Sequence, residues 1–368
     1  MKKILFVIYS YSMGGGAERV LTDIVNHMDQ SKYDISILPY AQYDIFEEQV
    51  NSNIKILPSI VDMNKEKKYK KYLKYILVHL FPEILRKKYI KNKYDVEISF
   101  NYQIPSFLVK ETKKTKVIEW NHGDVYDLQK RPFKRYLQRR SYKRATRIVA
   151  ISENTTQSIL NLFPQFQSKL AVIYNGVNIK RIQALSEEKC DIILKDPAIL
   201  FIGRIEEAKN PLQILEVIRN LKSNNKKINL YYVGTGSQDE LLKKRIKEYE
   251  LEDRVFCLGY QKNPYPIIKQ CRAICMMSKT EGFPTVFTEG MVLGKPFISS
   301  EVGGTNELSA KGKCGMVVHD SKECEKALEE VVLNLQNNEK MSENSKVHIE
   351  RFSLEQQISK IEGLIESL

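Results

Sequence analysis

Short apolar runs that alternate with helical patterns constrain the fold of this chain most strongly. Ten of these runs read as β-strands, and they occupy residues 4–9, 33–40, 94–100, 115–123, 146–152, 198–204, 228–236, 254–260, 273–279 and 295–304. Continuous apolar strands with helices between them are typical of parallel sheets covered on both faces. The sequence therefore predicts an α/β protein with two doubly wound, Rossmann-like domains that face each other across a cleft.

The boundary between the two domains is predicted at the Asn-Gly turn of "IYNGVNIKRI", residues 173–182. The 368 residues suit two domains of roughly 150 to 200 residues each, so we expect domains over residues 1–176 and 177–350.

No apolar stretch approaches the roughly 20 residues that a membrane span requires. The six cysteines form no CxxC pair, which indicates free thiols and no zinc site.

The stretch "EGFPTVFTEGMVLGKPFISSEVGGTNEL", residues 281–308, carries the most specific motif. It predicts a loop and then a helix over residues 286–293, with Thr285 as its N-cap. Free N–H groups at a helix start bind anions such as phosphate. Glu281 before the helix and Glu289 inside it would accept hydrogen bonds from hydroxyl groups on either side of that anion. The layout fits a sugar nucleotide, which has a hexose, a diphosphate and a ribose in line.

Two cations follow a strand in the segment "FIGRIEEAKNP". Arg204 comes directly after the strand, and Lys209 lies five residues later. A diphosphate leaving group gains negative charge as the glycosidic bond breaks, and cations placed on it stabilise that transition state. The arginine offers a bidentate fork and the lysine a compact charge. We therefore predict that Arg204 and Lys209 hold the diphosphate.

The first half of the chain offers two further candidate positions. Gly14, Gly15 and Gly16 stand between the first strand and a helix, where glycines allow a ligand close to the backbone. They do not match the GxGxxG fingerprint. His122 follows a strand in "EWNHGD" and is either a structural histidine or one that faces the cleft.

These motifs together resemble the family 4 glycosyltransferases of the GT-B fold, over nearly the whole chain. The resemblance is carried by "GGGAERVL", "AISENT", "YNGVNI", "FIGRIEEAKNP", "YYVGTGSQDELL", "FCLGYQKNPYPII" and the 281–308 stretch. It implies a retaining transfer from a nucleotide sugar without a metal or other cofactor, and a C-terminal helix over residues 351–368 that packs back on the first domain. The chain also contains no Asp-x-Asp, the diphosphate–metal motif of the other main glycosyltransferase fold.

The resemblance also assigns roles to single residues. Glu281 would contact the donor hexose and Glu289 the ribose, while Arg204 and Lys209 would hold the diphosphate. Further donor contacts would come from Gly15, Gly16, His122, Gly203, Tyr260, Gly282, Phe283, Pro284, Thr285 and Val286. Pro284 departs from the commoner glycine of the motif and removes one backbone N–H near the sugar, which leaves the identity of the hexose open.

The positive charge is concentrated in the first half of the chain. Residues 1–175 contain 30 Lys and Arg against 17 Asp and Glu, whereas the remainder contains 28 of each. Residues 64–94 predict an amphipathic helix with an apolar face of Tyr69, Tyr72, Leu73, Ile76 and Leu80. Its other face carries Lys67, Lys68, Lys70, Lys71 and Lys74. Such a helix suits an anionic membrane surface; a solvated lysine-rich face is the alternative, and no nucleic-acid motif accompanies the charge.

We therefore expect a glycosyltransferase at the cytoplasmic face of the cell membrane. It would move a hexose or N-acetylhexosamine from a nucleotide sugar, most simply UDP-linked, to a lipid-linked saccharide for a bacterial surface polysaccharide. The rival hypothesis is a catalytically silent GT-B subunit that binds glycan or supports a partner transferase. The presence of both acids and both cations disfavours the rival, because a silent copy has no chemical need for all four.

Overall fold

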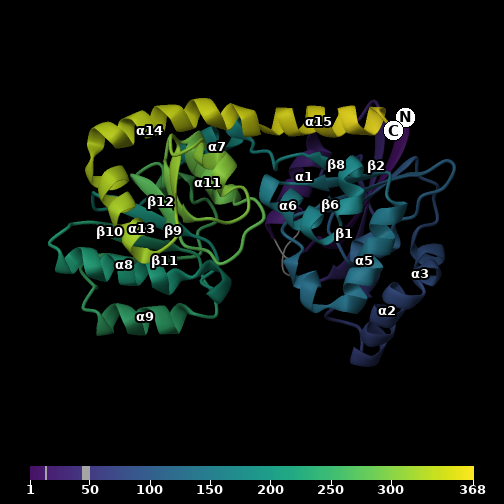
Figure 1. Ribbon diagram of the computed structural model, residues 1–368, viewed down its shortest axis with the longest axis horizontal. Coiled ribbons are helices and arrows are strands. Elements are labelled where there is room, and N and C mark those ends of the chain that lie inside the picture. The colour runs from purple at the N-terminus through teal and green to yellow at the C-terminus, as the bar shows by residue number, and fades with distance from the viewer. Residues whose placement is uncertain (13–14, 44–49) are drawn as a thin grey trace. The chain divides into compact units, whose positions relative to one another are not determined.

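The computed structural model describes residues 1–12, 15–43 and 50–368. The chain divides into two compact units. The first contains Met1–Gly176 together with Leu354–Leu368, and the second contains Val177–Ser353. Each unit has its own parallel sheet and its own helices (Figure 1).

The sheet of the first unit is parallel and follows the order β3-β2-β1-β5-β6-β7-β8, with β4 paired to β2. Its strands are β1 (Lys2–Ser10), β2 (Tyr33–Gln42), β3 (Lys55–Ile56), β4 (Val61–Asp62), β5 (Val96–Ser99), β6 (Lys116–Asn121), β7 (Arg147–Ala150) and β8 (Leu170–Val172). Its helices are α1 (Gly16–His27), α2 (Lys68–Leu80), α3 (Pro82–Tyr89), α4 (Ile104–Leu108), α5 (Pro132–Arg144), α6 (Glu153–Leu162), α15 (Leu354–Glu366) and the short turns η1 (Tyr126–Lys130) and η2 (Pro164–Lys169).

The sheet of the second unit is also parallel, in the order β11-β10-β9-β12-β13-β14. Its strands are β9 (Ala198–Ile202), β10 (Asn229–Val233), β11 (Val255–Gly259), β12 (Ala273–Met276), β13 (Phe297–Ser300) and β14 (Gly315–Val318). Its helices are α7 (Ile179–Ser186), α8 (Pro211–Ser223), α9 (Asp239–Glu248), α10 (Tyr265–Ile268), α11 (Thr285–Val292), α12 (Thr305–Ser309), α13 (Ser321–Leu328), α14 (Leu335–His348) and the short turns η3 (Glu207–Lys209), η4 (Glu329–Leu333) and η5 (Ile349–Phe352).

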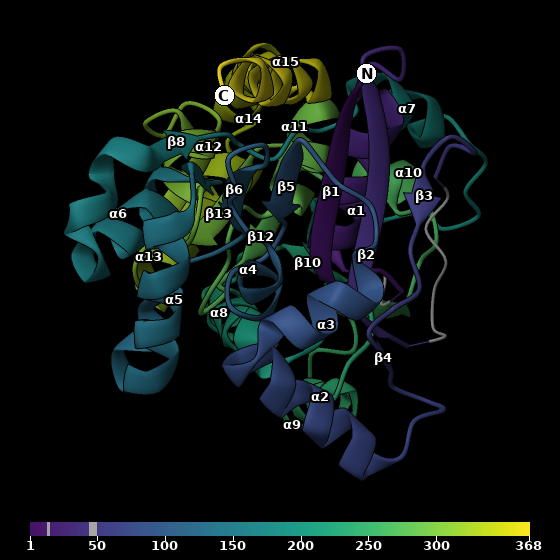
Figure 2. The same ribbon diagram turned by 90° about the vertical axis from the view of Figure 1, so that its right-hand side faces the viewer.

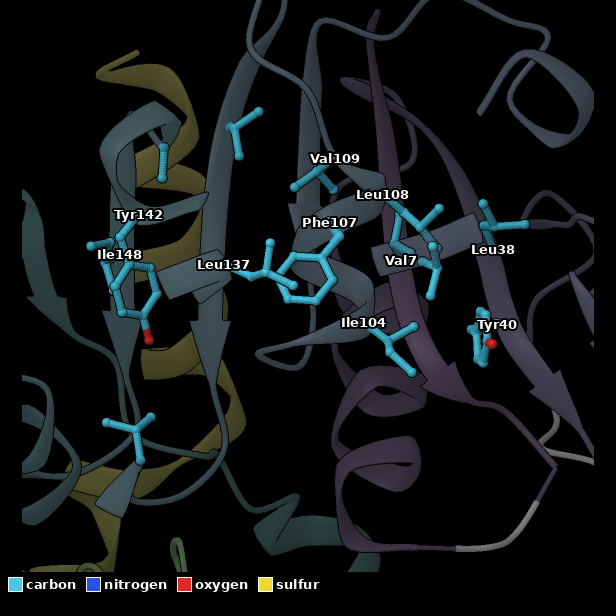
Figure 3. Close-up of a cluster of buried hydrophobic side chains, with 14 of the residues drawn as sticks. Val7, Leu38, Tyr40, Ile104, Phe107, Leu108, Val109, Leu137, Tyr142 and Ile148 are labelled. Carbon is cyan, nitrogen blue, oxygen red and sulfur yellow. The ribbon is translucent and has the colours of Figure 1, made fainter. Parts of the chain in front are cut away.

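All ten predicted strands occur, and the prediction of two Rossmann-like sheets is confirmed. The apolar runs are long because central parallel strands are buried on both faces; every residue from Ile4 to Val7 in β1, for example, is fully buried. Figure 3 shows Val7 and Leu38 of the sheet together with Phe107 and Leu108 of α4 in one cluster of the first unit. Within the described ranges, four further strands escaped prediction, namely β3, β4, β8 and β14, and each has only two to four residues.

The C-terminal helix α15 belongs to the first unit and packs against α1 (Figure 1). Glu366 accepts hydrogen bonds from Lys2 Nζ at 3.0 Å and from the Tyr33 hydroxyl at 2.8 Å. Glu362 accepts one from the backbone N–H of Asp29 at 2.9 Å. The helix begins at Leu354, three residues after the predicted start of this segment.

The basic segment folds differently from the prediction. It contains two helices, α2 and α3, which are separated at Phe81 and Pro82. Lys67, Lys68 and Lys70 are exposed, but Lys71 and Lys74 are half-buried and donate to backbone carbonyls of the same unit. The five lysines therefore do not form one exposed row. Within the described ranges, no helix is both long and apolar enough to cross a bilayer.

Candidate active site

The carboxyl edge of the second sheet gathers most of the predicted site residues. Because neighbouring parallel strands end at the same edge, the loops after β9, β10, β11, β12 and β13 lie together there. Arg204 follows β9, Tyr260 follows β11, and Glu281 lies in the loop after β12. Arg204 and Tyr260 are exposed, and Glu281 is mostly buried.

Glycines let the first two of these loops touch backbone to backbone. A Cβ atom on Gly234 would lie 2.0 Å from the carbonyl oxygen of Gly203, and one on Gly236 would lie 2.3 Å from that of Ile205. Gly234 also has a φ of +135°, which disfavours any side chain. The Ile205 N–H donates to the Thr235 carbonyl at 3.0 Å. The loop that carries Arg204 is therefore fixed by backbone contacts with the loop after β10.

Lys209 and Glu281 form an ion pair at this edge. Lys209 Nζ lies 2.5 Å from Oε1 and 2.7 Å from Oε2 of Glu281, and the two side chains keep only 23% and 10% of their exposure. A backbone hydrogen bond of 2.8 Å from the Lys279 N–H to the Ala208 carbonyl joins the two loops beside it. The structure thus brings together one of the predicted diphosphate cations and the predicted hexose acid, although 72 residues separate them in the chain.

A second pair of glycines supports the loop that carries Glu281. Gly303 has a φ of +52°, and a Cβ atom there would lie 2.3 Å from the carbonyl oxygen of Gly282. A Cβ atom on Gly304 would lie 2.3 Å from the ring of Phe283. Phe283 is buried and packs against Phe352 at 5.6 Å between ring centroids. The "GG" of the 281–308 stretch therefore makes room for the acid-bearing loop.

The start of α11 corrects one prediction. Thr285 is the first residue of the helix, and its N-cap is Pro284, which has extended backbone angles. Among the described residues, no side chain caps α11. The Phe287 N–H donates to the Pro284 carbonyl at 3.1 Å. The N-terminal N–H groups of α11 are thus not covered by a cap, and Glu289, half-buried, lies one turn further along.

In the first unit, Gly15 and Gly16 stand at the start of α1. Gly15 is the N-cap, and its N–H donates to Glu18 Oε2 at 3.1 Å. Both glycines are exposed, and a Cβ atom on either would meet nothing within 4 Å. Packing against the described residues therefore does not demand glycine at these two positions. Gly14 lies outside the described residues.

His122 follows β6 and is packed between aromatic rings. Its ring centroid lies 4.3 Å from that of Phe100, and it stacks near Trp120. The residue keeps some exposure, but both ring nitrogens are inaccessible and have no partner among the described residues. Burial lowers the pKa of His122 to about 3, so the ring is neutral.

A buried acid of β6 escaped the sequence prediction. Glu119 of β6 is 1% exposed and accepts hydrogen bonds from Ser141 Oγ and, at 2.8 Å, from Gln138 Nε2. Burial raises the pKa of Glu119 to about 7. The signal was a glutamate inside the apolar run "TKVIEWN". Its partners come from α5 of the same unit, so Glu119 joins that helix to the sheet.

No group of three or more His, Cys, Asp and Glu side chains within the described ranges is arranged to hold a metal ion. The cations in the loops at this edge include Arg204, Lys209, which is paired with Glu281, and Lys279, which is paired with Glu207.

Comparison with known proteins agrees with this architecture. The family model of group 1 glycosyl transferases matches residues 184–348, and the model of glycosyltransferase family 4 matches residues 14–181. A solved structure of Anabaena Alr3699/HepE in complex with UDP superposes with a TM-score of 0.75 at 18% identity, and covers 100% of both chains. Two Rossmann-like units of this kind define the GT-B class of glycosyltransferases. Within that class, the chain belongs to the family 4 glycosyltransferases, and it is an enzyme.

Two curated relatives come from Campylobacter jejuni. The first, N-acetylgalactosamine-N,N'-diacetylbacillosaminyl-diphospho-undecaprenol 4-alpha-N-acetylgalactosaminyltransferase, is 28% identical over 48% of this chain and 47% of its own length. The second, GalNAc-alpha-(1->4)-GalNAc-alpha-(1->3)-diNAcBac-PP-undecaprenol alpha-1,4-N-acetyl-D-galactosaminyltransferase, is 25% identical over 92% of this chain and 90% of its own length. The match thus spans about half of the first relative and most of the second.

Proposed function

We propose that the enzyme transfers a hexose or N-acetylhexosamine from a UDP-sugar to a lipid-linked saccharide, with retention of configuration and without a metal. The product would serve the synthesis of a bacterial surface polysaccharide, and the enzyme would act peripherally on the inner face of the cell membrane. The observation that carries the proposal is the ion pair of Lys209 and Glu281 at the carboxyl edge of the second sheet. It brings a cation suited to a diphosphate directly beside an acid suited to sugar hydroxyls.

The chemistry follows from the charges at this edge. As the bond from the sugar to the diphosphate breaks, negative charge grows on the leaving oxygen. Lys209, Arg204 and the N–H groups at the start of α11 stabilise that charge in place of a metal ion. Glu281 orients the hexose through its hydroxyl groups, and Glu289 accepts hydrogen bonds from the ribose. We assign no side chain as a nucleophile that would form a covalent intermediate with the sugar. Retention of the anomeric configuration then favours attack by the acceptor hydroxyl on the same face of the sugar that the diphosphate leaves. A phosphate oxygen of the leaving diphosphate takes the proton of that hydroxyl.

The comparisons support the donor and acceptor classes of this proposal. The Anabaena structure binds UDP, and both Campylobacter names describe acceptors linked to undecaprenol through a diphosphate. The roles of Gly15, Gly16, Gly203, Tyr260 and the backbone of residues 282–286 in donor binding rest on the family resemblance. The same holds for a contact between His122 and the donor sugar.

Two measurements test the proposal. A thermal-shift screen across UDP-, GDP- and ADP-sugars identifies the donor, and we expect stabilisation by UDP-sugars above the others. Release of UDP from the selected donor is then measured with and without lipid-linked saccharides extracted from membranes. We expect release to depend on the extract. Donor binding without any release would instead fit a silent subunit, and the absence of stabilisation by every nucleotide sugar would overturn the proposal.

A further inference from the structure

Helices α2 and α3 turn an apolar face outward. Six side chains along this face are between 53% and 67% exposed: Tyr69, Tyr72, Leu73, Leu80, Phe81 and Ile84. We call these six residues the α2–α3 apolar face. In Figure 2, α2 and α3 lie at the front of the view, and no element is drawn over them. Soluble proteins rarely leave contiguous apolar side chains exposed, and such patches mark interaction sites.

The opposite side of α2 is anchored to the first unit. Lys74 Nζ donates to the Ile60 carbonyl at 2.6 Å and to both carboxylate oxygens of Glu66 at 2.6 and 2.7 Å. Lys71 Nζ donates to the Met63 carbonyl, and Val78 is fully buried. Rotating α2 to hide its apolar face would break all of these contacts. The outward orientation is therefore built into the fold.

Helix α3 is held in the same way. Arg86 makes a bidentate ion pair with Glu97 of β5, at 2.8 and 2.9 Å, and both side chains are largely buried. Leu85 is buried, and the Tyr89 hydroxyl donates to the Ile60 carbonyl at 3.2 Å. Both helices thus present the apolar face from a rigid base.

Exposed cations surround this apolar face. The lysines are Lys67, Lys68, Lys70, Lys87 and Lys88. The one exposed acid on either helix, Glu83, is paired with Lys110 at 2.9 Å. Tyrosines and phenylalanines with long basic side chains beside them suit the boundary between lipid headgroups and acyl chains, where the rings enter and the ammonium groups reach phosphates.

The start of α5 has the same combination of side chains. Phe133 and Tyr136 are exposed there, together with Arg131, Arg135 and Arg139. Both α5 and α2 contact the α4 segment: Lys134 Nζ donates to the Gln103 side chain at 3.2 Å, next to α4, and Phe107 of α4 lies 5.5 Å from the ring of His79 in α2. The first unit therefore exposes aromatic and basic side chains on α5 as well as on α2 and α3.

We propose that the α2–α3 apolar face enters the headgroup layer of an anionic bilayer, with the lysines around it on lipid phosphates. This inference rests on the lipid-linked acceptor of the proposed function and specifies how the enzyme meets the membrane. A second copy of the chain fits less well, because the same lysines would face each other across the contact. A nucleic acid would leave the exposed rings and leucines without a role.

Vesicle co-sedimentation of the full chain tests the proposal, with phosphatidylglycerol-containing and pure phosphatidylcholine vesicles. The apolar variant carries Leu73→Ser, Phe81→Ser and Ile84→Ser. The matched control carries the same change at three exposed apolar residues of the second unit, Ile193→Ser, Leu335→Ser and Val347→Ser. We expect anionic vesicles to bind the wild type and the control alike, and the apolar variant to bind at least about tenfold more weakly.

A charge variant separates the two contributions. Lys67→Gln, Lys68→Gln and Lys70→Gln should weaken binding to anionic vesicles about tenfold or more at low salt, since each basic residue near the surface contributes to the attraction. Lys71 and Lys74 are left unchanged because they hold α2 in place. An unchanged melting temperature and unchanged UDP-sugar binding show that each variant is folded.

Three results would overturn the inference. They are equal binding to neutral and anionic vesicles, wild-type binding by the apolar variant, and a dimer in sedimentation velocity that the apolar variant abolishes. Vesicle binding needs neither donor nor acceptor, so its failure is distinct from a failure of UDP release, which decides the proposed function.

Discussion

Replacing Lys209 with Met separates the structural effect of its ion pair from the catalytic one. The Lys209 ammonium contacts both carboxylate oxygens of Glu281, whose side chain keeps only 10% of its exposure. Without the cation, a mostly buried carboxylate loses its partner. Removing one member of a fully buried pair costs about 3–5 kcal/mol, and the residual exposure of this pair lowers our expectation to about 2 kcal/mol.

The double variant Lys209→Met, Glu281→Gln should recover most of that stability. It removes the buried charge along with its partner, so we expect it to be within about 1 kcal/mol of the wild type. Turnover should behave differently. The diphosphate loses a cation in both variants, so transfer should fall about 10²-fold or more in each and should not recover in the double variant.

Denaturant unfolding of the wild type, Lys209→Met, Glu281→Gln and the double variant gives the four stabilities of a double-mutant cycle, and UDP release gives turnover. Lys279→Met is the matched control, since Lys279 pairs at 2.7 Å with Glu207 in the same loops, but those side chains are 52% and 79% exposed. It should change stability by less than about 0.5 kcal/mol. The reasoning is refuted if Lys209→Met is as stable as this control, or if the double variant regains turnover.

Four further predictions follow from the same site and from the buried acid of the first unit. Arg204→Ala should slow UDP release about 10²-fold with an unchanged unfolding midpoint, because the side chain is exposed; near wild-type turnover would remove it from the site. Glu289→Gln should raise the KM for the donor more than it lowers kcat, in steady-state kinetics, since we propose that Glu289 binds the ribose rather than the reacting bond; a loss confined to kcat would contradict this role. Activity should persist in EDTA, because Arg204, Lys209 and the start of α11 supply the positive charge, and a strict requirement for added Mg²⁺ or Mn²⁺ would oppose it. The pKa of Glu119 is raised from 4.5 to about 7, so between these pH values the folded state binds the proton that the unfolded state has lost, and stability declines as pH rises. Glu119→Gln removes that decline. In denaturant titrations, the free energy of unfolding of Glu119→Gln minus that of the wild type should therefore increase by about 3 kcal/mol from pH 4.5 to 7.5. If the free energies of unfolding of the two proteins change in parallel with pH, the pKa of Glu119 is an ordinary one.

The longer strands of both sheets and their order along the chain were predictable from the sequence alone. An apolar run such as Ile4–Val7 reports burial on both faces, which is a property of a central parallel strand and needs no knowledge of its neighbours. Strands such as β3 and β8 could not be predicted in this way. They have two and three residues, too few for a pattern, and they exist because a longer strand beside them offers hydrogen bonds.

In the candidate site, too, some features were predictable from the sequence and others depend on the tertiary structure. Glu281 and the start of α11 were predicted from one continuous motif, and Lys209 from another, because spacing along the chain was enough to suggest their chemistry. The direct contact between Lys209 and Glu281 was not predictable. It depends on how β9 and β12 pair and on the glycines that let the loops approach each other. The burial of Glu119 likewise depends on α5 packing over β6, 19 residues away in the chain.

The orientation of the basic helix α2 could not be predicted from hydrophobic periodicity. The sequence by itself determined that one side of residues 68–80 is apolar and the other carries lysines, because a helical repeat fixes which residues share a side. Only the tertiary structure decided which side faces the protein. Ile60, Met63 and Glu66 offer oxygen atoms to Lys71 and Lys74, so these two lysines turn toward the protein. Tyr69, Tyr72, Leu73 and Leu80 turn outward, and Lys67, Lys68 and Lys70 stay exposed. Hydrophobic periodicity favours burial of the apolar side, and here specific hydrogen bonds from elsewhere in the fold overrule it.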